Sequence, residues 1–251
     1  MSSLVADTRL LGARSILRAR RNPATVVGAI VFPLLFFALF NIVMRKVLDA
    51  QGFDYVQLLP PTIVVQAMIF TGMSSAYYVA ADRLSGFSTR LRSLPVHRAS
   101  PILGRAVGDL TRASVSLVVI VAVGVVSGMR FESFGGAIGF LGVALSFALV
   151  ASLGMGLLGY VASSPDAAVS IASVPYLPLL MLSSGFVPVE DFPQWLQPFV
   201  EWQPVTAVID ALRALAGDGD LGDTLPVAVG WIVGLGVVFA ALGARAFGRS
   251  S

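Results

Sequence analysis

The chain has 251 residues, of which 56% are hydrophobic and 12% are charged, about half the roughly 25% charged residues of an ordinary soluble domain. So few charges cannot cover the surface of a soluble protein of this size, which excludes soluble globular, fibrous and disordered classes and indicates an integral membrane protein. The formal net charge is +3, cysteine is absent and His97 is the single histidine, which excludes disulfides, thiolate sites and a histidine metal cluster.

Residues 4–21 carry an amphipathic pattern ahead of the first long apolar stretch. Ala6, Leu10, Ala13 and Leu17 recur at helical spacing, and arginines flank this stripe on both sides. The pattern predicts an interfacial helix whose arginines reach lipid phosphates. A plain basic anchor without fixed structure is the alternative interpretation.

Six apolar stretches follow, each about as long as the roughly 20 residues that a membrane-spanning helix needs. The predicted spans are residues 24–44, 58–81, 113–129, 137–162, 167–189 and 224–244. Backbone polar groups find no water inside a bilayer, so these spans must be helical, and the alternating pattern of a membrane barrel is missing. We therefore predict an all-α integral membrane protein with one transmembrane domain over residues 1–251.

Residues 82–95, which follow the second span, have apolar residues at helical spacing and arginines between them. This pattern predicts another amphipathic helix. Its candidate docking residues are Arg83, Leu84, Phe87, Arg90, Leu91 and Leu94. A further helix is expected from about Ser100 into the third span, with Asp109 able to pair with Arg105 or Arg112. Two interpretations stay open: a pair of membrane-surface helices, or a docking element for a cytoplasmic partner, because partner grooves bind amphipathic helices through this spacing.

The spans contain no ionisable residue well inside them, which argues against an ion- or proton-coupled carrier. They do contain aromatic and polar side chains that could line a path for a hydrophobic or aromatic cargo. The candidate pathway residues are Phe36, Phe40, Gln66, Thr71, Tyr77 and Tyr176. Phenylalanines that only face lipid or pack against neighbouring helices would give the same pattern.

Residues 190–223, between the fifth and sixth spans, are rich in acidic residues, prolines and aromatic residues. Tryptophan and phenylalanine of this kind favour a membrane interface. The segment predicts short interfacial or re-entrant helices before the sixth span, one of them over residues 205–216.

Charge sorts between the loops and predicts the orientation. With both termini in the cytoplasm, 13 of the 17 basic residues lie inside and ten of the 14 acidic residues lie outside, as the positive-inside rule requires. This sorting also explains the basic net charge without nucleic acid as a partner.

Enzymatic chemistry is not expected from this chain. The single lysine, Lys46, is not part of a phosphate loop, so the chain has no ATP site of that kind. Ser183 and Ser184 could serve as nucleophiles, but His97 lies in a loop on the opposite side and cannot act as their base. We predict no catalytic residue and no metal ligand. We therefore expect that the energy for transport comes from outside this chain.

Two stretches resemble the permease subunits of type 2 ABC exporters, close to the daunorubicin-resistance drug-efflux branch. The first holds Asp82, Arg83, Gly86, Leu91, Leu94-Pro95-Val96, Pro101 and Gly104-Arg105; the second holds residues 182–188, Phe192-Pro193, Trp195-Leu196, Pro204 and Ala211-Leu212-Arg213. Neither stretch is a catalytic motif. Together with the six spans, they extend the resemblance over essentially the whole chain.

The resemblance implies a permease in the bacterial inner membrane that moves a hydrophobic drug, lipid or polyketide outward. It implies a dimer of identical or homologous permeases above two ATP-binding subunits, which would hold ATP and Mg²⁺, and it makes the loop after the second span the coupling element. A membrane enzyme or assembly factor without ATP-coupled transport is the alternative function.

Overall fold

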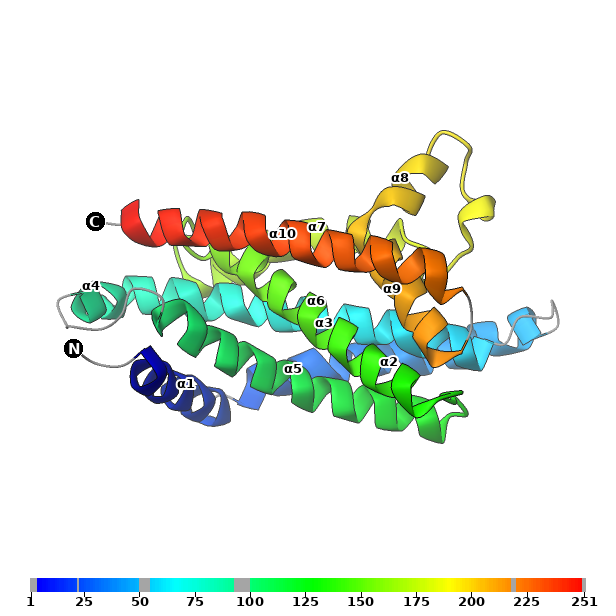
Figure 1. Cartoon of the computed structure of the whole chain (residues 1–251), viewed down its shortest axis with the longest axis horizontal. Helices are drawn as coiled ribbons and strands as arrows, with labels where there is room; N and C mark the ends of the chain where they lie inside the picture. The colour runs from blue at the N-terminus through cyan, green and yellow to red at the C-terminus, as the bar shows by residue number, and fades with distance from the viewer. Residues whose placement is uncertain (1–3, 22, 50–54, 93–99, 218–219, 250–251) are drawn as a thin grey trace.

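The computed structural model describes residues 4–21, 23–49, 55–92, 100–217 and 220–249, and these ranges contain helices and turns but no strand. The elements are α1 (Leu4–Arg21), α2 (Pro23–Asp49), α3 (Tyr55–Leu84), α4 (Phe87–Arg92), α5 (Ser100–Val126), α6 (Phe134–Leu158), α7 (Pro165–Met181), the 3₁₀ helix η1 (Val189–Asp191), α8 (Gln197–Trp202), α9 (Pro204–Ala216) and α10 (Leu221–Arg249). The long helices form an elongated bundle, in which α1, α4 and the end of α10 share one end and α8 projects near the other (Figure 1).

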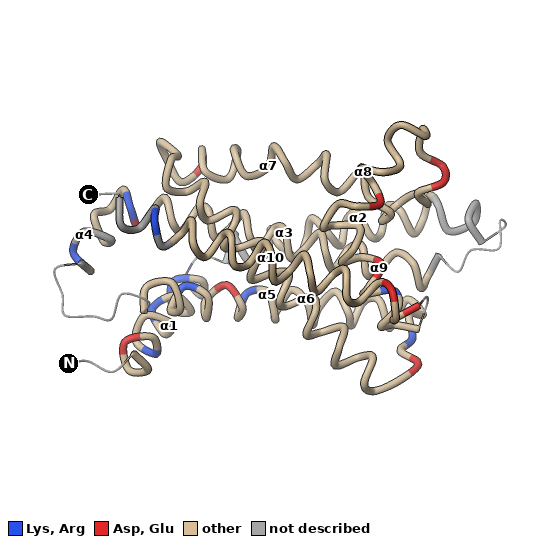
Figure 2. Tube along the Cα trace, turned by 45° about the horizontal axis from the view of Figure 1, so that its top comes forward, with Lys and Arg blue, Asp and Glu red and all other residues tan. Residues whose placement is uncertain are grey.

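Six of these helices follow the predicted spans in order. Four are long and apolar enough to cross a membrane: Val56–Leu84, Ser100–Val126, Phe134–Leu158 and Leu221–Gly243. Val27–Val43 and Pro165–Met181 are apolar but shorter. Charged residues lie mainly toward the two ends of the bundle (Figure 2). The structure is therefore that of an all-helical membrane protein.

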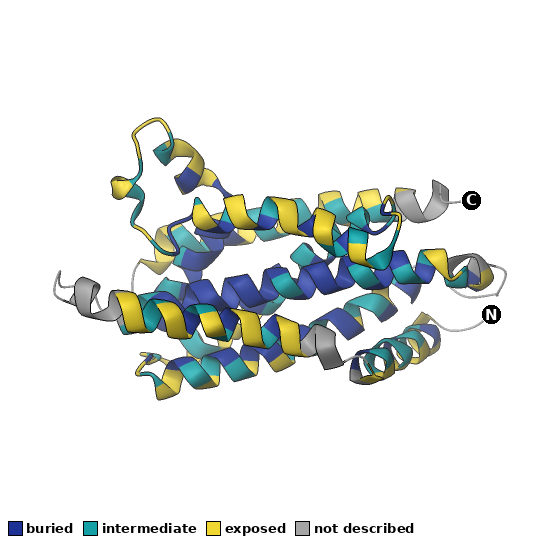
Figure 3. Ribbon diagram, turned by 180° about the vertical axis from the view of Figure 1, so that it is seen from behind, coloured by how far each residue is buried: buried dark blue, intermediate teal, exposed yellow. Residues whose placement is uncertain are grey.

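Helix α3 is the centre of the bundle. In its most apolar stretch 78% of residues are buried, against 6% in α10. Helices α2, α5, α6, α7 and α9 all pack against it, and Figure 3 shows its buried surface between helices with exposed outer stripes. A helix enclosed in this way by its own chain is shielded from lipid, so it can carry the polar side chains that lipid would exclude.

Helix α1 lies tightly against the first half of α5. A Cβ atom on Gly104 would lie 2.4 Å from the Leu11 Cβ atom, and one on Gly108 would lie 2.6 Å from the Ser15 Cβ atom. Only glycine permits so close an approach of two helices at these positions. The predicted apolar stripe faces away from this contact, since Leu10 and Leu17 are exposed.

The predicted helix over the 82–95 loop is wrong as a single element. Helix α3 continues to Leu84, and Gly86 then adopts a φ of +70°, a left-handed conformation that breaks the helix before α4 begins at Phe87. Leu84 therefore belongs to a different helix from Phe87 and Leu91, and Leu94 lies outside the described residues.

Helix α7 ends at Met181, eight residues before the predicted end of the fifth span at residue 189. The Ser183 hydroxyl donates to the Leu180 carbonyl oxygen at 2.6 Å and accepts from the Gly185 N–H at 3.2 Å. This local bonding competes with the helix, so residues 182–188 are not helical even though none of them is charged.

Substituting Gly104 tests the contact between α1 and α5. Gly104→Ala should destabilise the protein by about 1–3 kcal/mol, because the new methyl group overpacks a close helix contact. Gly142→Ala is the matched control in α6, where a Cβ atom meets nothing within 4 Å and should be neutral or stabilising by up to about 1 kcal/mol. The measurement is the apparent unfolding temperature in detergent, and equal values for both variants would contradict the close contact.

Candidate functional site

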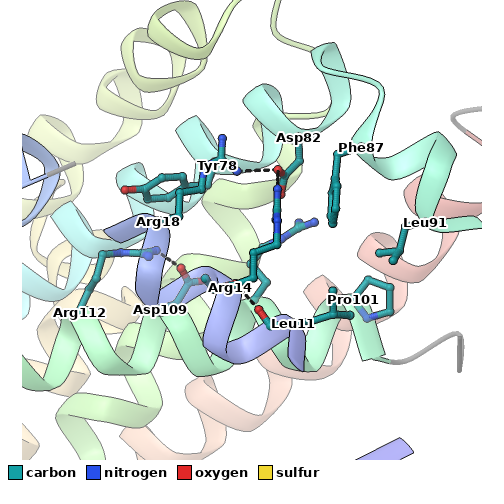
Figure 4. A pocket seen from close by; sticks show the side chains of 12 residues that line it. Leu11, Arg14, Arg18, Tyr78, Asp82, Phe87, Leu91, Pro101, Asp109 and Arg112 are labelled. Carbon is teal, nitrogen blue, oxygen red and sulfur yellow. Dashed lines mark hydrogen bonds and ion pairs between the residues drawn. The ribbon is translucent and has the colours of Figure 1, made fainter. Parts of the chain in front are cut away.

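An ion-pair cluster joins α1 to the end of α3, and we call Arg14, Arg18 and Asp82 the Asp82 clamp. Arg14 Nη2 donates to Asp82 Oδ1 at 3.1 Å, and Arg18 Nη1 donates to the same oxygen at 2.5 Å. The arginine side chains are 39% and 31% exposed, and that of Asp82 is 11% exposed. One nearly buried carboxylate thus holds two cations of α1 next to the α3–α4 corner (Figure 4).

Helix α4 packs against the clamp. The guanidinium carbon of Arg14 lies 3.6 Å from the centroid of the Phe87 ring, a cation–π contact. Leu91 is buried, and it lines the same small pocket as Leu11 of α1 and Pro101 of α5 (Figure 4). The apolar side of α4 is therefore filled by the chain itself.

A second polar layer lies deeper, between α3 and α5. Asp109 accepts hydrogen bonds from Arg112 and, at 3.0 Å, from the Ser75 hydroxyl. Tyr78 lies between the two layers, with the guanidinium carbons of Arg18 and Arg112 at 5.0 and 4.7 Å from its ring centroid. The predicted pairing of Asp109 with an arginine on the same helix is confirmed, and Arg112 is the partner.

Arg83 points toward the turn between α6 and α7. It donates to the carbonyl oxygens of Tyr160, at 2.6 Å, and of Ala162. These carbonyls lie in the turn after α6, so the guanidinium group pairs with acceptors that belong to no helix. The end of α3 is in this way tied to α1 on one side and to the α6–α7 turn on the other.

The candidate docking residues thus divide into two groups. Arg83, Phe87 and Leu91 contact other helices or turns of the chain. Leu84 is 51% exposed, and Arg90 is exposed and donates to the Ser85 carbonyl oxygen at 3.4 Å. The five described candidates therefore do not share one exposed surface.

Several candidate pathway residues do come together, in a line of aromatic rings that we call the aromatic row. In spatial order the row is Phe186, Phe40, Phe36, Phe32, Phe70 and Tyr176. Consecutive ring centroids are 4.6, 5.9, 5.1, 5.1 and 5.1 Å apart, which is the usual range for aromatic pairs. The row joins α2, α3 and α7 and extends to the non-helical segment after α7.

Gln66 lies at the Tyr176 end of the row. Its side-chain amide is fully buried and donates to the Tyr176 hydroxyl at 2.6 Å, while its Oε1 atom has no partner among the described residues. Thr71 is also buried, but its hydroxyl bonds to the Ala67 carbonyl of its own helix. Tyr77 packs edge-on against Tyr78 at the clamp. Thr71 and Tyr77 are therefore not part of the aromatic row.

A third polar cluster stabilises the segment after α7, and its centre is Arg213 of α9. Arg213 donates to the carbonyl oxygens of Ser184 and Gly185, each at 3.0 Å. The Thr62 hydroxyl donates to the Gly185 carbonyl at 2.9 Å, and Gln203 donates to the Leu182 carbonyl. The carbonyl groups released where α7 ends are thus paired, although they lie among apolar helices.

Asp210 completes this cluster and is partly shielded from solvent. Its Oδ1 atom accepts a hydrogen bond from the Ser184 hydroxyl at 2.7 Å and lies 3.5 Å from Arg213 Nη1. Burial raises the pKa of the Asp210 carboxyl above its ordinary value, and the Ser184 hydroxyl and Arg213 only partly oppose this shift. Within the described ranges, no group of three or more His, Asp or Glu side chains could hold a metal ion.

The Asp82 clamp and the Arg213 cluster were not anticipated. The Asp82 bonds join residues 64 and 68 positions apart, and no local pattern reports such a pairing. For Arg213 a signal was present, because it is the single basic residue in an acidic, apolar segment. An arginine in that setting needs acceptors, and the segment after α7 offers carbonyl groups.

The sequence pattern of the ABC-2 type transporter family matches residues 6–216. The doxorubicin resistance ABC transporter permease protein DrrB of Mycobacterium tuberculosis is 34% identical over 202 residues, covering 77% of this chain and 69% of that protein. A DrrC permease of the same organism, also named for doxorubicin resistance, is 31% identical over 253 residues, covering 98% and 90%. The daunorubicin resistance ABC transporter permease protein DrrB1 of Streptomyces coeruleorubidus is 28% identical over 239 residues, covering 93% and 83%.

The raised pKa of Asp210 predicts how stability depends on pH. The neutral carboxyl fits the buried cluster better, so its contribution is full below the unfolded pKa of about 3.9 and is lost as the pH rises through the raised pKa. Asp210→Asn should therefore match the wild-type unfolding temperature in acid and exceed it at neutral pH. Asp191→Asn, an exposed acid outside the cluster, should show no such trend. A wild type more stable than Asp210→Asn at neutral pH would contradict this sign.

Proposed function

The chain belongs to the ABC-2 type transporter family and is a multi-pass membrane permease subunit of an ABC exporter, and on that premise we propose that it moves a planar aromatic drug or a similar hydrophobic compound outward across the bacterial inner membrane. Members of this family work with an ATP-binding subunit. We propose two copies of that subunit, which hold ATP and Mg²⁺, and a second permease that is identical or homologous.

The aromatic row is the observation that carries the proposed cargo. Its ring pairs range from stacked through tilted to edge-on, and a planar aromatic guest offers the same contacts. Each ring pair is worth roughly 0.5–1.5 kcal/mol beyond area burial, so exchanging a ring–ring contact for a ring–cargo contact changes the energy little. A path of this kind admits cargo without trapping it. All three relatives described above are named for daunorubicin or doxorubicin resistance, and both drugs have planar fused rings.

The Gln66–Tyr176 pair adds a polar contact to this path. The Oε1 atom of Gln66 has no partner in the described part of the chain, and a buried acceptor without a donor is costly. We propose that a hydroxyl group of the cargo donates to it as the rings of the row separate. Polycyclic compounds with hydroxyl substituents would then be preferred over pure hydrocarbons.

The proposed orientation places the Asp82 clamp in the cytoplasm. The start of α1, helix α4 and the end of α10 share one end of the bundle (Figure 1), and the basic segments of the sequence belong to that end. Six spans, with α2 and α7 as the two shorter ones, put both termini there. The ATP-binding subunit would then bind the exposed residues Leu84 and Arg90 and act on α1 and on the α6–α7 turn through Asp82 and Arg83.

Transport into everted membrane vesicles tests the proposed cargo path. Vesicles with this permease and its cognate ATP-binding subunit should take up daunorubicin in an ATP-dependent manner, measured as loss of drug fluorescence. Phe40→Ala should lower uptake about tenfold, because two ring pairs of the row are lost. Phe134→Ala is the matched control, since that ring is 83% exposed and outside the row. Equal uptake by both variants would exclude the row as the path, and no uptake by the wild type would exclude the cargo.

Docking of the ATP-binding subunit is tested with one exposed leucine on each candidate surface. Leu84→Asp should reduce co-purification of the ATP-binding subunit at least about tenfold, as expected for loss of an apolar anchor. Leu10→Asp changes an equally apolar residue on α1, which is 71% exposed, and should leave co-purification unchanged. Elution of both variants as a single symmetric peak controls for folding. Release by Leu10→Asp alone would place the docking surface on α1.

A further inference from the structure

A cavity of about 330 Å³ lies between α7 and α10, and no residue of the Asp82 clamp lines it. We call it the lateral slot. Tyr176 and Leu179 of α7 form one wall, Leu235 and Phe239 of α10 form the other, and Ala151 of α6 lies in the floor. Helix α7 packs mainly on α3 and α10 packs on α6 and α9, so these two helices leave the space between them unfilled.

The slot lies at the depth of the hydrocarbon region of a bilayer. Leu235 and Ala151 are both in the middle part of apolar helices long enough to span a membrane. Beside the slot, Val174 and Leu177 of α7 are 72% and 53% exposed, and Val237 of α10 is 66% exposed. Apolar surface that is exposed in the single chain therefore borders the slot on both helices.

The lining of the slot has almost no polar group. No charged side chain lines it, and its one hydroxyl group, that of Tyr176, already accepts a hydrogen bond from Gln66. A headgroup or an ion would lose its hydration here without compensation. Apolar cavities do bind apolar guests: one of about 150 Å³ is enough to hold benzene.

We propose that the lateral slot binds one acyl chain of a membrane lipid, which completes the packing between α7 and α10. A volume of about 330 Å³ suits a flexible hydrocarbon chain better than a second copy of the chain, because a helix with side chains is roughly 10 Å across. The slot and the aromatic row share Tyr176, whose ring packs on Phe70. None of the five phenylalanines of the row lines the slot, and the proposal does not depend on the cargo path.

The test is photochemical labelling of the purified chain in phosphatidylglycerol–phosphatidylethanolamine bilayers. A phosphatidylcholine with a diazirine in the middle of one acyl chain serves as the probe, and labelled residues are located by mass spectrometry of peptides. The wild type should be labelled at Val150 and Ala151, which line the slot, as well as on the outward faces of α7 and α10. Ala151→Phe fills the slot and should reduce labelling of this α6 peptide at least tenfold, with outward labelling unchanged. Val174→Phe, on the outward face of α7, is the matched control and should keep the α6 label.

Each alternative occupant gives a different outcome. Wild-type label confined to outward faces, or an α6 label that persists in Ala151→Phe, would overturn the proposal. Loss of the α6 label on adding daunorubicin would assign the slot to cargo instead of lipid. If Ala151→Phe does not fold, the wild-type map and the daunorubicin competition still decide. The measurement needs neither ATP nor the ATP-binding subunit, so its failure is distinguishable from failure of the proposed transport.

Discussion

A backbone carbonyl group that lies beyond the end of a helix and among apolar helices needs a hydrogen-bond donor. In this chain Arg213 is that donor, and one end of the fold depends on it. Helix α7 stops at Met181, and Arg213 donates to the Ser184 and Gly185 carbonyls that follow, the second of which also accepts from the Thr62 hydroxyl. Arg213 reaches them because α9 lies against α3 and α6. The break in α7 in turn places Phe186 at the end of the aromatic row, so one guanidinium group fixes both the backbone turn and the ring that begins the row.

The opposite end of the bundle uses the same chemistry for a different purpose. Arg14, Arg18 and Arg83 also bind oxygen atoms that helices present at their ends, but these contacts join separate elements instead of repairing one. Exposed ion pairs contribute little to stability, typically about 0–1 kcal/mol, and both clamp arginines are about a third exposed. The Asp82 clamp therefore sets the position of α1 more than it stabilises the fold. Contacts this weak can rearrange when a partner subunit moves.

Hydropathy predicted the order of the long helices because burial in lipid imposes it on every residue of a span. Local pattern was less reliable where another force competes with it. Leu84, Phe87 and Leu91 have helical spacing, but Gly86 favours a left-handed turn and separates them. The apolar face of this segment was expected to meet either lipid or a partner, yet Phe87 contacts Arg14 of α1 and Leu91 is buried beside Leu11 and Pro101. An amphipathic pattern does not tell which surface buries it. Phe36, Phe40 and Tyr176 were predicted as pathway residues from their residue type alone. The row that they join depends on how α2, α3 and α7 cross, and these crossings cannot be predicted from local sequence.

The close contact between α1 and α5 has a consequence for biosynthesis. Arg14 and Asp82 are 68 residues apart, and at roughly 5–20 residues per second the ribosome takes roughly 3–14 s to supply the second after the first. Gly104, against which α1 packs, is made later still. During that interval α1 has no groove to occupy, and the membrane surface is the environment that its arginines and its exposed Leu10 and Leu17 suit. The amphipathic pattern of α1 therefore suits binding to the membrane surface during synthesis, before α1 packs against α5 in the complete protein.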